Sequence, residues 1–418
     1  MVLGTSKKKP APATTELERI RRQLEYPPGA RRIEEDGSVT YTKAPLSSVV
    51  NLQIILGQDG DFYPHLGYNE FTGETTWAGE PFSDHLETAI NCQIAEKYKL
   101  KTGTERVREL MILVARQHPY HPIRDYLQSL TWDGVPRIDR LLVQYVGAED
   151  VPLNRALARR WMFGCIARVM RPGCQMDTTL ILVGKQGAGK SSFFRSMVPR
   201  ANWFSDTAMD LASKDAFQQL HGVWIYEVAE LSALRVKDAE SVKAFLTARV
   251  DRYRPAYARN MIRIERQVVF VGTTNEAEFL DDPTGARRFW PVQVDAIKLD
   301  ELERDRDQLW AEAFELFETE GSSARWHLTE EEASWMQDRH SLHARTDSWK
   351  DLLADYMSQY GKGEGVPMDM ILSECLELEK RDQHRGNAMR VASLLTSLGY
   401  QKGRSMRNGV RSYRWRLV

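Results

Sequence analysis

The sequence predicts an α/β protein whose core is a parallel sheet with helices, preceded by a mostly helical region and followed by a small helix-and-hairpin domain. Three apolar runs, TTLILVG, VWIYEV and QVVFVGTTN, alternate with helical segments between residues 178 and 275. Consecutive apolar positions are typical of strands buried on both faces, as in parallel sheets covered by helices. The last seventy or so residues show three helical patterns and then two strand-like runs around Asn408-Gly409, a strong hairpin signal. That order is the outline of a winged helix.

Length and composition predict more than one domain. The chain has 418 residues, and its hydrophobic fraction of 42% is ample for real cores. Residues 1–45 are polar and proline-rich, which predicts a disordered tail or linker. Residues 46–172 carry apolar residues at helical spacing, interrupted by a strand-and-turn stretch at 66–77. We therefore predict a helical N-terminal region at 46–172, the α/β core with a helical extension at 173–345, and the winged-helix-like domain at 346–418.

Charge is balanced over the whole chain but not along it. Lysine and arginine total 57 against 58 acidic residues. Residues 295–338 carry a net charge of about −10, whereas residues 380–418 carry about +9. This layout favours a polyanion contacted by one end of the chain. The four cysteines are too far apart for a CxxC pair, and no signal peptide or membrane-length apolar run is present, so we expect a reduced, cytoplasmic protein without a membrane partner.

A glycine-rich loop follows the first apolar run. The stretch GKQGAGKS matches G-x-x-x-x-G-K-[ST] after a strand and before a helical pattern, the context that this phosphate-binding motif requires. Backbone N–H groups and the helix N-terminus suit phosphate oxygens, a lysine adds charge, and a serine hydroxyl suits Mg²⁺. We therefore predict an ATP and Mg²⁺ site whose binding residues are Gly184, Gly187, Gly189, Lys190, Ser191 and Ser192, with Ser191 as a metal ligand. The alternative is a chance match in a glycine-rich turn.

Polar residues follow the second and third apolar runs. Glu227 ends the second run, Glu230 lies three residues on, and Asn275 ends the third. Because the carboxyl ends of parallel strands meet at one edge, these side chains are expected near the loop. We assign Glu227 to the metal, one of the two glutamates to the attacking water, and Asn275 to that water or the γ-phosphate. The alternatives are solvated acids and an exposed turn asparagine.

Two arginines, Arg287 and Arg288, follow a glycine turn and precede another apolar strand. A guanidinium held on a rigid element suits an arginine finger, which stabilises developing charge during phosphoryl transfer. The pattern does not rank the two arginines. The structural alternative is pairing with Asp281 and Asp282.

With these residues in place, the chain resembles the virulence-associated E family of phage, prophage and plasmid proteins, a branch of the superfamily 3 helicase-like ATPases. The resemblance covers roughly residues 119–314 and rests on HPIRDYLQSLTWDGVPRID, GKQGAGKSSFFRSM, FSDTAMDLASKDAFQQLHGVWIYEVAEL, VDRYRPAYAR, GTTNEAEFLDDPTGARRFWPV and RDQLWAEAF. It implies an AAA+-like core, a ring (a hexamer is expected) with ATP between subunits, and an arginine finger supplied in trans. It also implies translocation on DNA during replication of a mobile element in a bacterial host.

Many relatives carry a primase-like region upstream. Residues 1–118 show no paired-acid strand pattern and no zinc-ligand cluster, so a primase is expected, if at all, as a separate partner.

Two basic segments are candidate DNA contacts. Between the second and third core strands, arginines alternate with Tyr253 and Tyr257, a combination suited to single-stranded DNA. The resemblance places a pore hairpin here, and the candidates are Lys243, Arg252, Arg254 and Arg259. A basic surface hairpin or interface salt bridges are the alternative. The C-terminal hairpin carries Arg407, Arg411 and Arg414 without an acid nearby, which suits a duplex backbone, although a solvated face or a protein contact also fits.

Three functions fit these observations. The leading one is a DNA-dependent ATPase acting as a ring-forming replicative helicase or replication initiator. The second is an ATP-binding DNA scaffold or helicase loader with little turnover, which stimulation of hydrolysis by single-stranded DNA separates from the first. The third is a small-molecule kinase, against which the late arginine pair and the basic C-terminus count.

Overall fold

The structure is a computed structural model of the chain, and it describes residues 15–208, 216–229, 244–254, 261–275, 288–343, 348–360, 365–407 and 410–417. Contacts divide the described residues into two compact units, one ending at Gln337 and the other beginning at Asp338. Within the described ranges, no helix is long and apolar enough to cross a membrane.

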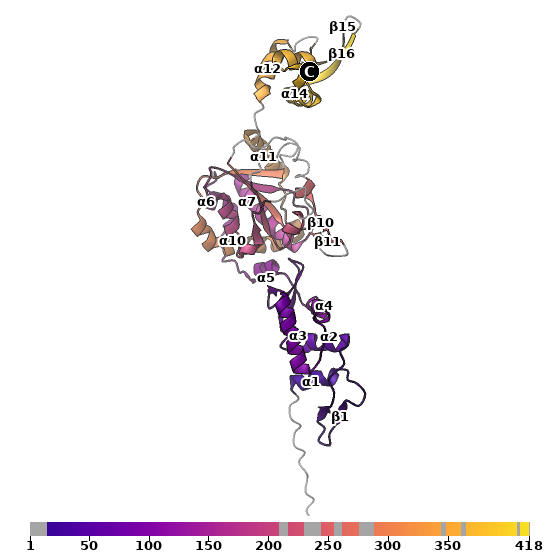
Figure 1. The fold of residues 1–418 in the computed structure, drawn as a ribbon. Coiled ribbons are helices and arrows are strands. Elements are labelled where there is room, and N and C mark those ends of the chain that lie inside the picture. The colour runs from indigo at the N-terminus through magenta and orange to yellow at the C-terminus, as the bar shows by residue number, and fades with distance from the viewer. Residues whose placement is uncertain are drawn as a thin grey trace, which may run out of the picture. The chain divides into compact units, whose positions relative to one another are not determined.

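The N-terminal part of the first unit is a helical cluster with short hairpins (Figure 1). Its helices are α1 (Glu16–Gln23), α2 (Val49–Gln58), α3 (Asp84–Tyr98) and α4 (Thr104–Ala115). Its strands are β1 (Arg31–Ile33), β2 (Val39–Tyr41), β3 (Leu66–Asn69), β4 (Glu74–Trp77), β5 (Glu80–Pro81) and β6 (Pro119–Tyr120). The strand and turn expected at 66–77 is the β3–β4 hairpin.

The structure differs from the expected disordered tail over residues 15–45, and residues 1–14 lie outside the described residues. Thr15 and Glu18 form a reciprocal capping box at the start of α1. Ile20 is fully buried and Leu24 is 6% exposed, both in the cluster formed with α2, α3 and α4. Two apolar residues a turn apart are enough to dock a short helix, although they are too few to show a period in a polar stretch.

The core of the first unit is a five-stranded sheet, which confirms the predicted α/β fold with a parallel sheet. Its strands are β7 (Thr179–Val183), β8 (Phe204–Ser205), β9 (Ile225–Ala229), β12 (Val269–Thr274) and β13 (Phe289–Gln293). They run parallel in the order β13-β7-β12-β9-β8. Every residue of β7 and β12 is buried, as the apolar runs predict.

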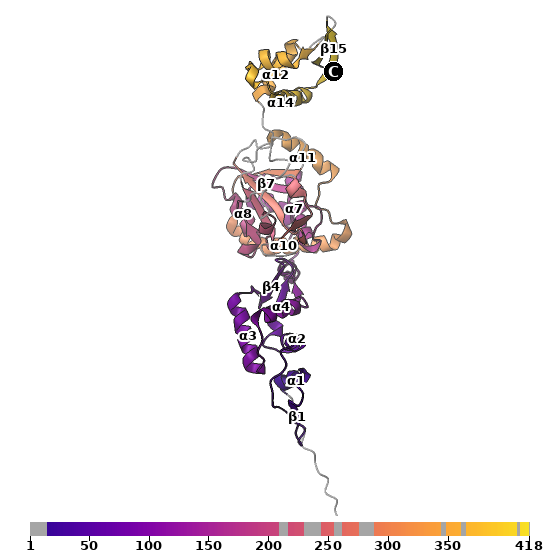
Figure 2. The ribbon, with the colours of Figure 1, turned by 45° about the vertical axis from the view of Figure 1, so that its right-hand side comes forward.

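Helices pack around this sheet (Figure 2). They are α5 (Pro122–Ser129), α6 (Leu141–Val146), α7 (Pro152–Met170), α8 (Lys190–Ser196), α10 (Leu299–Glu320) and α11 (Glu330–His343). Two tryptophans fix these helices: Trp224 Nε1, just before β9, donates to the Cys165 carbonyl of α7 at 3.0 Å, and Trp310 Nε1 of α10 donates to the Met197 carbonyl at the end of α8 at 2.7 Å. Their rings lie 4.5 Å apart, centroid to centroid.

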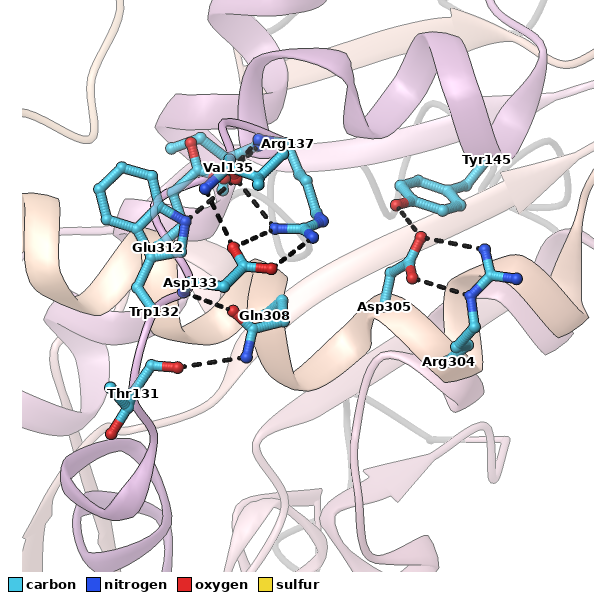
Figure 3. Close-up of polar contacts among 11 residues, drawn as sticks. Thr131, Trp132, Asp133, Val135, Arg137, Tyr145, Arg304, Asp305, Gln308 and Glu312 are labelled. Atoms are coloured by element: carbon cyan, nitrogen blue, oxygen red, sulfur yellow. Dashed lines mark hydrogen bonds and ion pairs between the residues drawn. The ribbon is translucent and has the colours of Figure 1, made fainter.

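The loop that contains TWDGVPR is fixed to α10 by side chains of that helix (Figure 3). Gln308 accepts from the Asp133 N–H at 2.9 Å and donates to the Thr131 carbonyl at 3.2 Å. Glu312 accepts from the backbone N–H groups of Arg137 and Ile138 at 2.5 and 2.9 Å. This stretch, which contributes to the family resemblance, therefore has a structural role in joining α5 and α6 to α10.

A separate hairpin, β10 (Val250–Tyr253) and β11 (Ile262–Glu265), precedes β12. Its base is anchored by a buried ion pair between Arg266 and Asp251, and Arg266 also donates to the Phe245 carbonyl. Arg249 Nε donates to the Gly173 carbonyl at 2.7 Å. The hairpin thus stands on a rigid base beside the sheet.

The second unit contains α12 (Ser348–Tyr360), β14 (Val366–Pro367), α13 (Met368–Met370), α14 (Arg385–Ser397), β15 (Tyr400–Arg407) and β16 (Val410–Leu417). The three strands form an antiparallel sheet in the order β14-β16-β15. The middle helical pattern is shorter than the sequence predicts, since α13 continues only as a π-helical turn to Cys375. The long β15–β16 ribbon matches the expected hairpin, and Asn408-Gly409 at its tip lies outside the described residues.

Candidate functional site

The glycine-rich loop lies between β7 and α8, at the carboxyl edge of the sheet. The Gly184 N–H donates to the Thr274 carbonyl at 3.1 Å, which ties the start of the loop to the end of β12. Gly187 and Gly189 have φ of +78° and +86°, in the left-handed region that glycine tolerates best. Two of the three glycines singled out from the sequence are therefore required by the turn of the loop into α8.

Lys190 lies under this loop and is only 8% exposed. Its Nζ donates to the carbonyls of Gly184 and Lys185 and to Asn275 Oδ1, each at 2.8 Å. Burial lowers the pKa of Lys190, and the nearby charge of Glu227 opposes that change. The contacts hold a cation at the mouth of the loop and bring together two residues that the sequence assigns to one site.

Glu227, in the middle of β9, is 2% exposed and lies beside Ser191. Its Oε1 accepts from the Ser191 hydroxyl at 2.7 Å and from the Thr273 hydroxyl at 2.6 Å. Its Oε2 is buried and has no hydrogen-bond partner within the described part of the chain. A carboxylate oriented through one oxygen, with the other oxygen unsatisfied, has acceptor capacity left for a ligand.

Thr273 is the site residue that sequence reasoning missed. It lies two positions beyond Val271, which pairs with Glu227 across β12 and β9, so its side chain emerges on the same face one step nearer the loop. The available signal was the alternation along GTTN, in which Thr273 lies two positions before Asn275 and so shares its face of the sheet.

The contacts above bring Lys190, Ser191, Glu227 and Asn275 together at the carboxyl edge of the sheet. Ser192 follows in the first turn of α8 and is half-buried. Glu230 and Arg287 lie outside the described residues.

Arg288 lies at the edge of the sheet formed by the amino ends of the strands, whereas the glycine-rich loop lies at the carboxyl ends. It immediately precedes β13, whose Phe289 pairs with Thr179 at the start of β7 while Gln293 pairs with Val183 at its end. At about 3.3 Å per residue, Arg288 is about 17 Å along the strand direction from the end of β7. Its Nε is buried without a hydrogen-bond partner among the described residues. A single chain therefore does not bring Arg288 to its own glycine-rich loop.

The β10–β11 hairpin divides its basic and aromatic residues between surface and interior. Arg252 and Arg254 are exposed, and Arg252 pairs directly across the hairpin with the exposed Arg263. Like charges in directly opposed positions destabilise a strand pair, so this arrangement favours a bound polyanion. Tyr253, in contrast, is 9% exposed and packs edge-on against His221, so it is not available to stack on a base. Lys243, Arg259 and Tyr257 lie outside the described residues.

The basic residues of the C-terminal ribbon are described in part. Arg414 is half-buried and donates to the Gly365 carbonyl at 3.1 Å, which gives it a structural contact. The backbones of Arg407 and Arg411 lie in the outer half of the ribbon, and their side chains lie outside the described part of the structure.

The model of the virulence-associated protein E-like domain matches residues 127–345, more than half of the chain. The chain belongs to this family. The match confirms the resemblance seen in the sequence, and it spans the loop, the five strands and the β10–β11 hairpin. No curated protein matches the sequence.

Solved structures share parts of this arrangement at low similarity. An apo structure of the C-terminal region of NrS-1 is 12% identical with a TM-score of 0.49, over 84% of this chain and 96% of that one. A mutant of RuvB from Thermotoga maritima is 13% identical with a TM-score of 0.23, over 61% and 91%. Because both scores lie below 0.5, neither likeness supports a conclusion about function.

Proposed function

We propose that the chain is a DNA-dependent ATPase with an AAA+-like core, acting as a ring-forming replicative helicase or replication initiator of a phage or other mobile element. One observation carries the proposal: Lys190 and Ser191 of α8 meet Asn275, which follows β12, and Glu227 of β9 around a glycine-rich loop, with donor-acceptor distances of 2.8 and 2.7 Å. This is the set of groups that ATP hydrolysis needs, namely a cradle, a cation, a hydroxyl and a carboxylate.

The donor set fits ATP with Mg²⁺. The backbone N–H groups of residues 185–189 and the Lys190 ammonium suit phosphate oxygens, and the Ser191 hydroxyl with the unsatisfied Glu227 Oε2 suits a hard cation. Bound Mg²⁺ would neutralise charge on the β- and γ-phosphates. Ser191 would then release its hydrogen bond to Glu227, while Thr273 keeps that carboxylate in place. Glu227 or Glu230 would orient the attacking water, and Asn275 would hold it in line.

DNA is the proposed polymeric partner. The exposed Arg252 and Arg254 of the β10–β11 hairpin are proposed to contact phosphates of single-stranded DNA in the ring, together with Lys243 and Arg259. The C-terminal unit is proposed to be a winged helix that also contacts duplex DNA through its ribbon, and a separate primase is a candidate partner.

The test is ATP hydrolysis by the purified chain with and without single-stranded DNA, alongside molecular mass in solution with an ATP analogue. We expect hydrolysis to rise with single-stranded DNA and a hexamer to form with the analogue. Lys190→Ala should abolish turnover because the loop loses its cation, and unchanged turnover in that variant would remove the assignment. ATP binding with little turnover that DNA does not stimulate would instead indicate a loader or scaffold.

A further inference from the structure

The β15–β16 ribbon is longer than the core of its unit requires. Its inner half packs into that core through Tyr400 and Trp415, which are 8% and 5% exposed. Its third strand, β14, pairs only with Arg414 and Trp415. Beyond these residues the outer half extends past the helices of its own unit (Figure 1 and Figure 2). The outer half therefore contributes little to the core of the unit.

One face of the ribbon presents an aromatic ring of β16 beside two cations of β15. Arg404 and Tyr413 are direct cross-strand partners, and Lys402 lies two positions back along β15 on the same face. Lys402 Nζ is 4.9 Å from the Tyr413 ring centroid, and the Arg404 guanidinium carbon is 5.8 Å from it. Arg404 Nε also donates to the Tyr413 hydroxyl at 3.2 Å. Tyr413 is nevertheless 53% exposed.

These contacts fix the ring while leaving much of it open to solvent. A large exposed aromatic side chain gains nothing from burial, and the two cations hold it in one orientation. Other basic residues add to the positive charge of the ribbon, because its sequence from Lys402 to Arg416 contains six basic residues and no acidic one. A ligand that fits must offer a flat π-face together with negative charge close to it.

We propose that Tyr413 is a stacking platform for an unpaired base of single-stranded DNA, with Lys402 and Arg404 contacting the flanking phosphates. In a duplex each base is already stacked between its neighbours, so its face is not accessible to the ring. Stacking on an aromatic side chain tolerates any base, which suits a protein that meets arbitrary sequence. The site rests on the DNA-binding part of the proposed function but not on ATP hydrolysis.

The first experiment is photocross-linking of the full chain to a single-stranded thymidine oligonucleotide that carries 5-iododeoxyuridine, with the linked peptide identified by mass spectrometry. We expect the link at Tyr413, in the parent and equally in Lys190→Ala. A link at Tyr413 in a variant without turnover separates this site from the ATPase site. DNA-stimulated hydrolysis with no link at Tyr413 would overturn the platform alone.

The second experiment measures dissociation constants for the single strand and for a duplex of the same length. Arg252→Gln and Arg254→Gln are included as a background, so that the core hairpin does not mask the ribbon. We expect Tyr413→Leu to weaken single-strand binding about five- to 150-fold, the range for one stacked base, with duplex binding changed less than about twofold. Tyr413→Phe should retain binding.

The matched control is Tyr360→Leu, which removes a tyrosine of similar exposure, 59%, from the same unit without touching the ribbon. It should leave both dissociation constants unchanged. Equal losses for single strand and duplex in Tyr413→Leu would mean that the ribbon contacts only the backbone, and unchanged single-strand binding would mean that the ring makes no contact. Either result overturns the proposal.

Discussion

Thr273 supports a sharp prediction, because its hydroxyl contacts the proposed catalytic carboxylate and nothing in its role requires contact with nucleotide. It donates to Glu227 Oε1 at 2.6 Å in the buried interior of the sheet. Thr273→Val keeps the branched shape and the strand preference but removes the donor. The variant therefore tests the hydrogen bond rather than the packing.

The expected magnitude follows from the kind of bond removed. A hydrogen bond to a charged group contributes about 1.5–3 kcal/mol, and about 1.4 kcal/mol of activation free energy corresponds to a tenfold change in rate. If the bond holds Glu227 for the hydrolytic step, kcat for ATP should fall about 10- to 150-fold. KM should change little, because the phosphate cradle and Lys190 are intact.

The assay is steady-state ATP hydrolysis across a range of Mg²⁺ concentrations, together with the equilibrium affinity for an ATP analogue. Thr273→Ser, which restores the hydroxyl, should recover most of the lost rate. A Thr273→Val protein with the parent's kcat would refute the positioning role. Equal losses in Thr273→Val and Thr273→Ser would assign the effect to packing in β12 instead.

Three further outcomes are expected. Glu227→Gln should still bind ATP but hydrolyse it about 100-fold more slowly, measured by analogue binding and turnover, and normal turnover would leave Glu230 as the acting carboxylate. At least one of Arg287→Ala and Arg288→Ala should bind ATP with little hydrolysis and, once subunit exchange is shown, that variant should recover activity when mixed with Lys190→Ala; no recovery at any ratio would contradict a finger in trans. His121 is buried, its Nδ1 accepts from the Arg124 N–H at 3.3 Å, and its Nε2 lies 2.7 Å from Gln267 Oε1. Burial lowers the pKa of His121 below its usual 6.5, so the folded state favours the neutral imidazole. The stabilisation that this preference contributes is fully present above pH 6.5 and is lost as the pH falls toward the lowered pKa. In urea titrations at pH values below 6.5, the free energy of unfolding should fall with pH more steeply in the parent than in His121→Asn, by up to about 1.4 kcal/mol per pH unit. Parallel slopes in the two proteins would exclude this role.

The central sheet could be predicted because its strands are buried on both faces. The run LILV reads as β7 from composition alone, and the loop that follows needs glycine at two positive-φ positions. Strand β8 has only two residues, Phe204 and Ser205, so it shows no period. Its pairing with β9 depends on tertiary contacts that a local pattern does not contain.

Side-chain roles were less predictable than backbone elements. Arg266 and Arg252 belong to the same basic stretch, yet one is buried in an ion pair with Asp251 and the other is exposed. Tyr253 likewise fits an aromatic residue of a candidate DNA-binding segment by sequence, but the structure shows that its hydroxyl lies within hydrogen-bond distance of His221. Composition locates a basic hairpin, but the alternation of the strand and the identity of its neighbours decide which of its side chains are exposed.

The position of Arg288 links the chemistry to assembly. Strands β7 and β13 are parallel and in register over five residues, so a side chain before β13 and a loop after β7 lie at opposite edges of the sheet. Moving Arg288 to the loop of its own chain would require breaking that pairing, which is buried at Trp290 and Val292. We infer that, if Arg288 acts on phosphate, it acts on nucleotide held by another copy. A monomer would then hold the cradle, the lysine and the carboxylate but lack the finger, so turnover should depend on protein concentration whereas nucleotide binding should not.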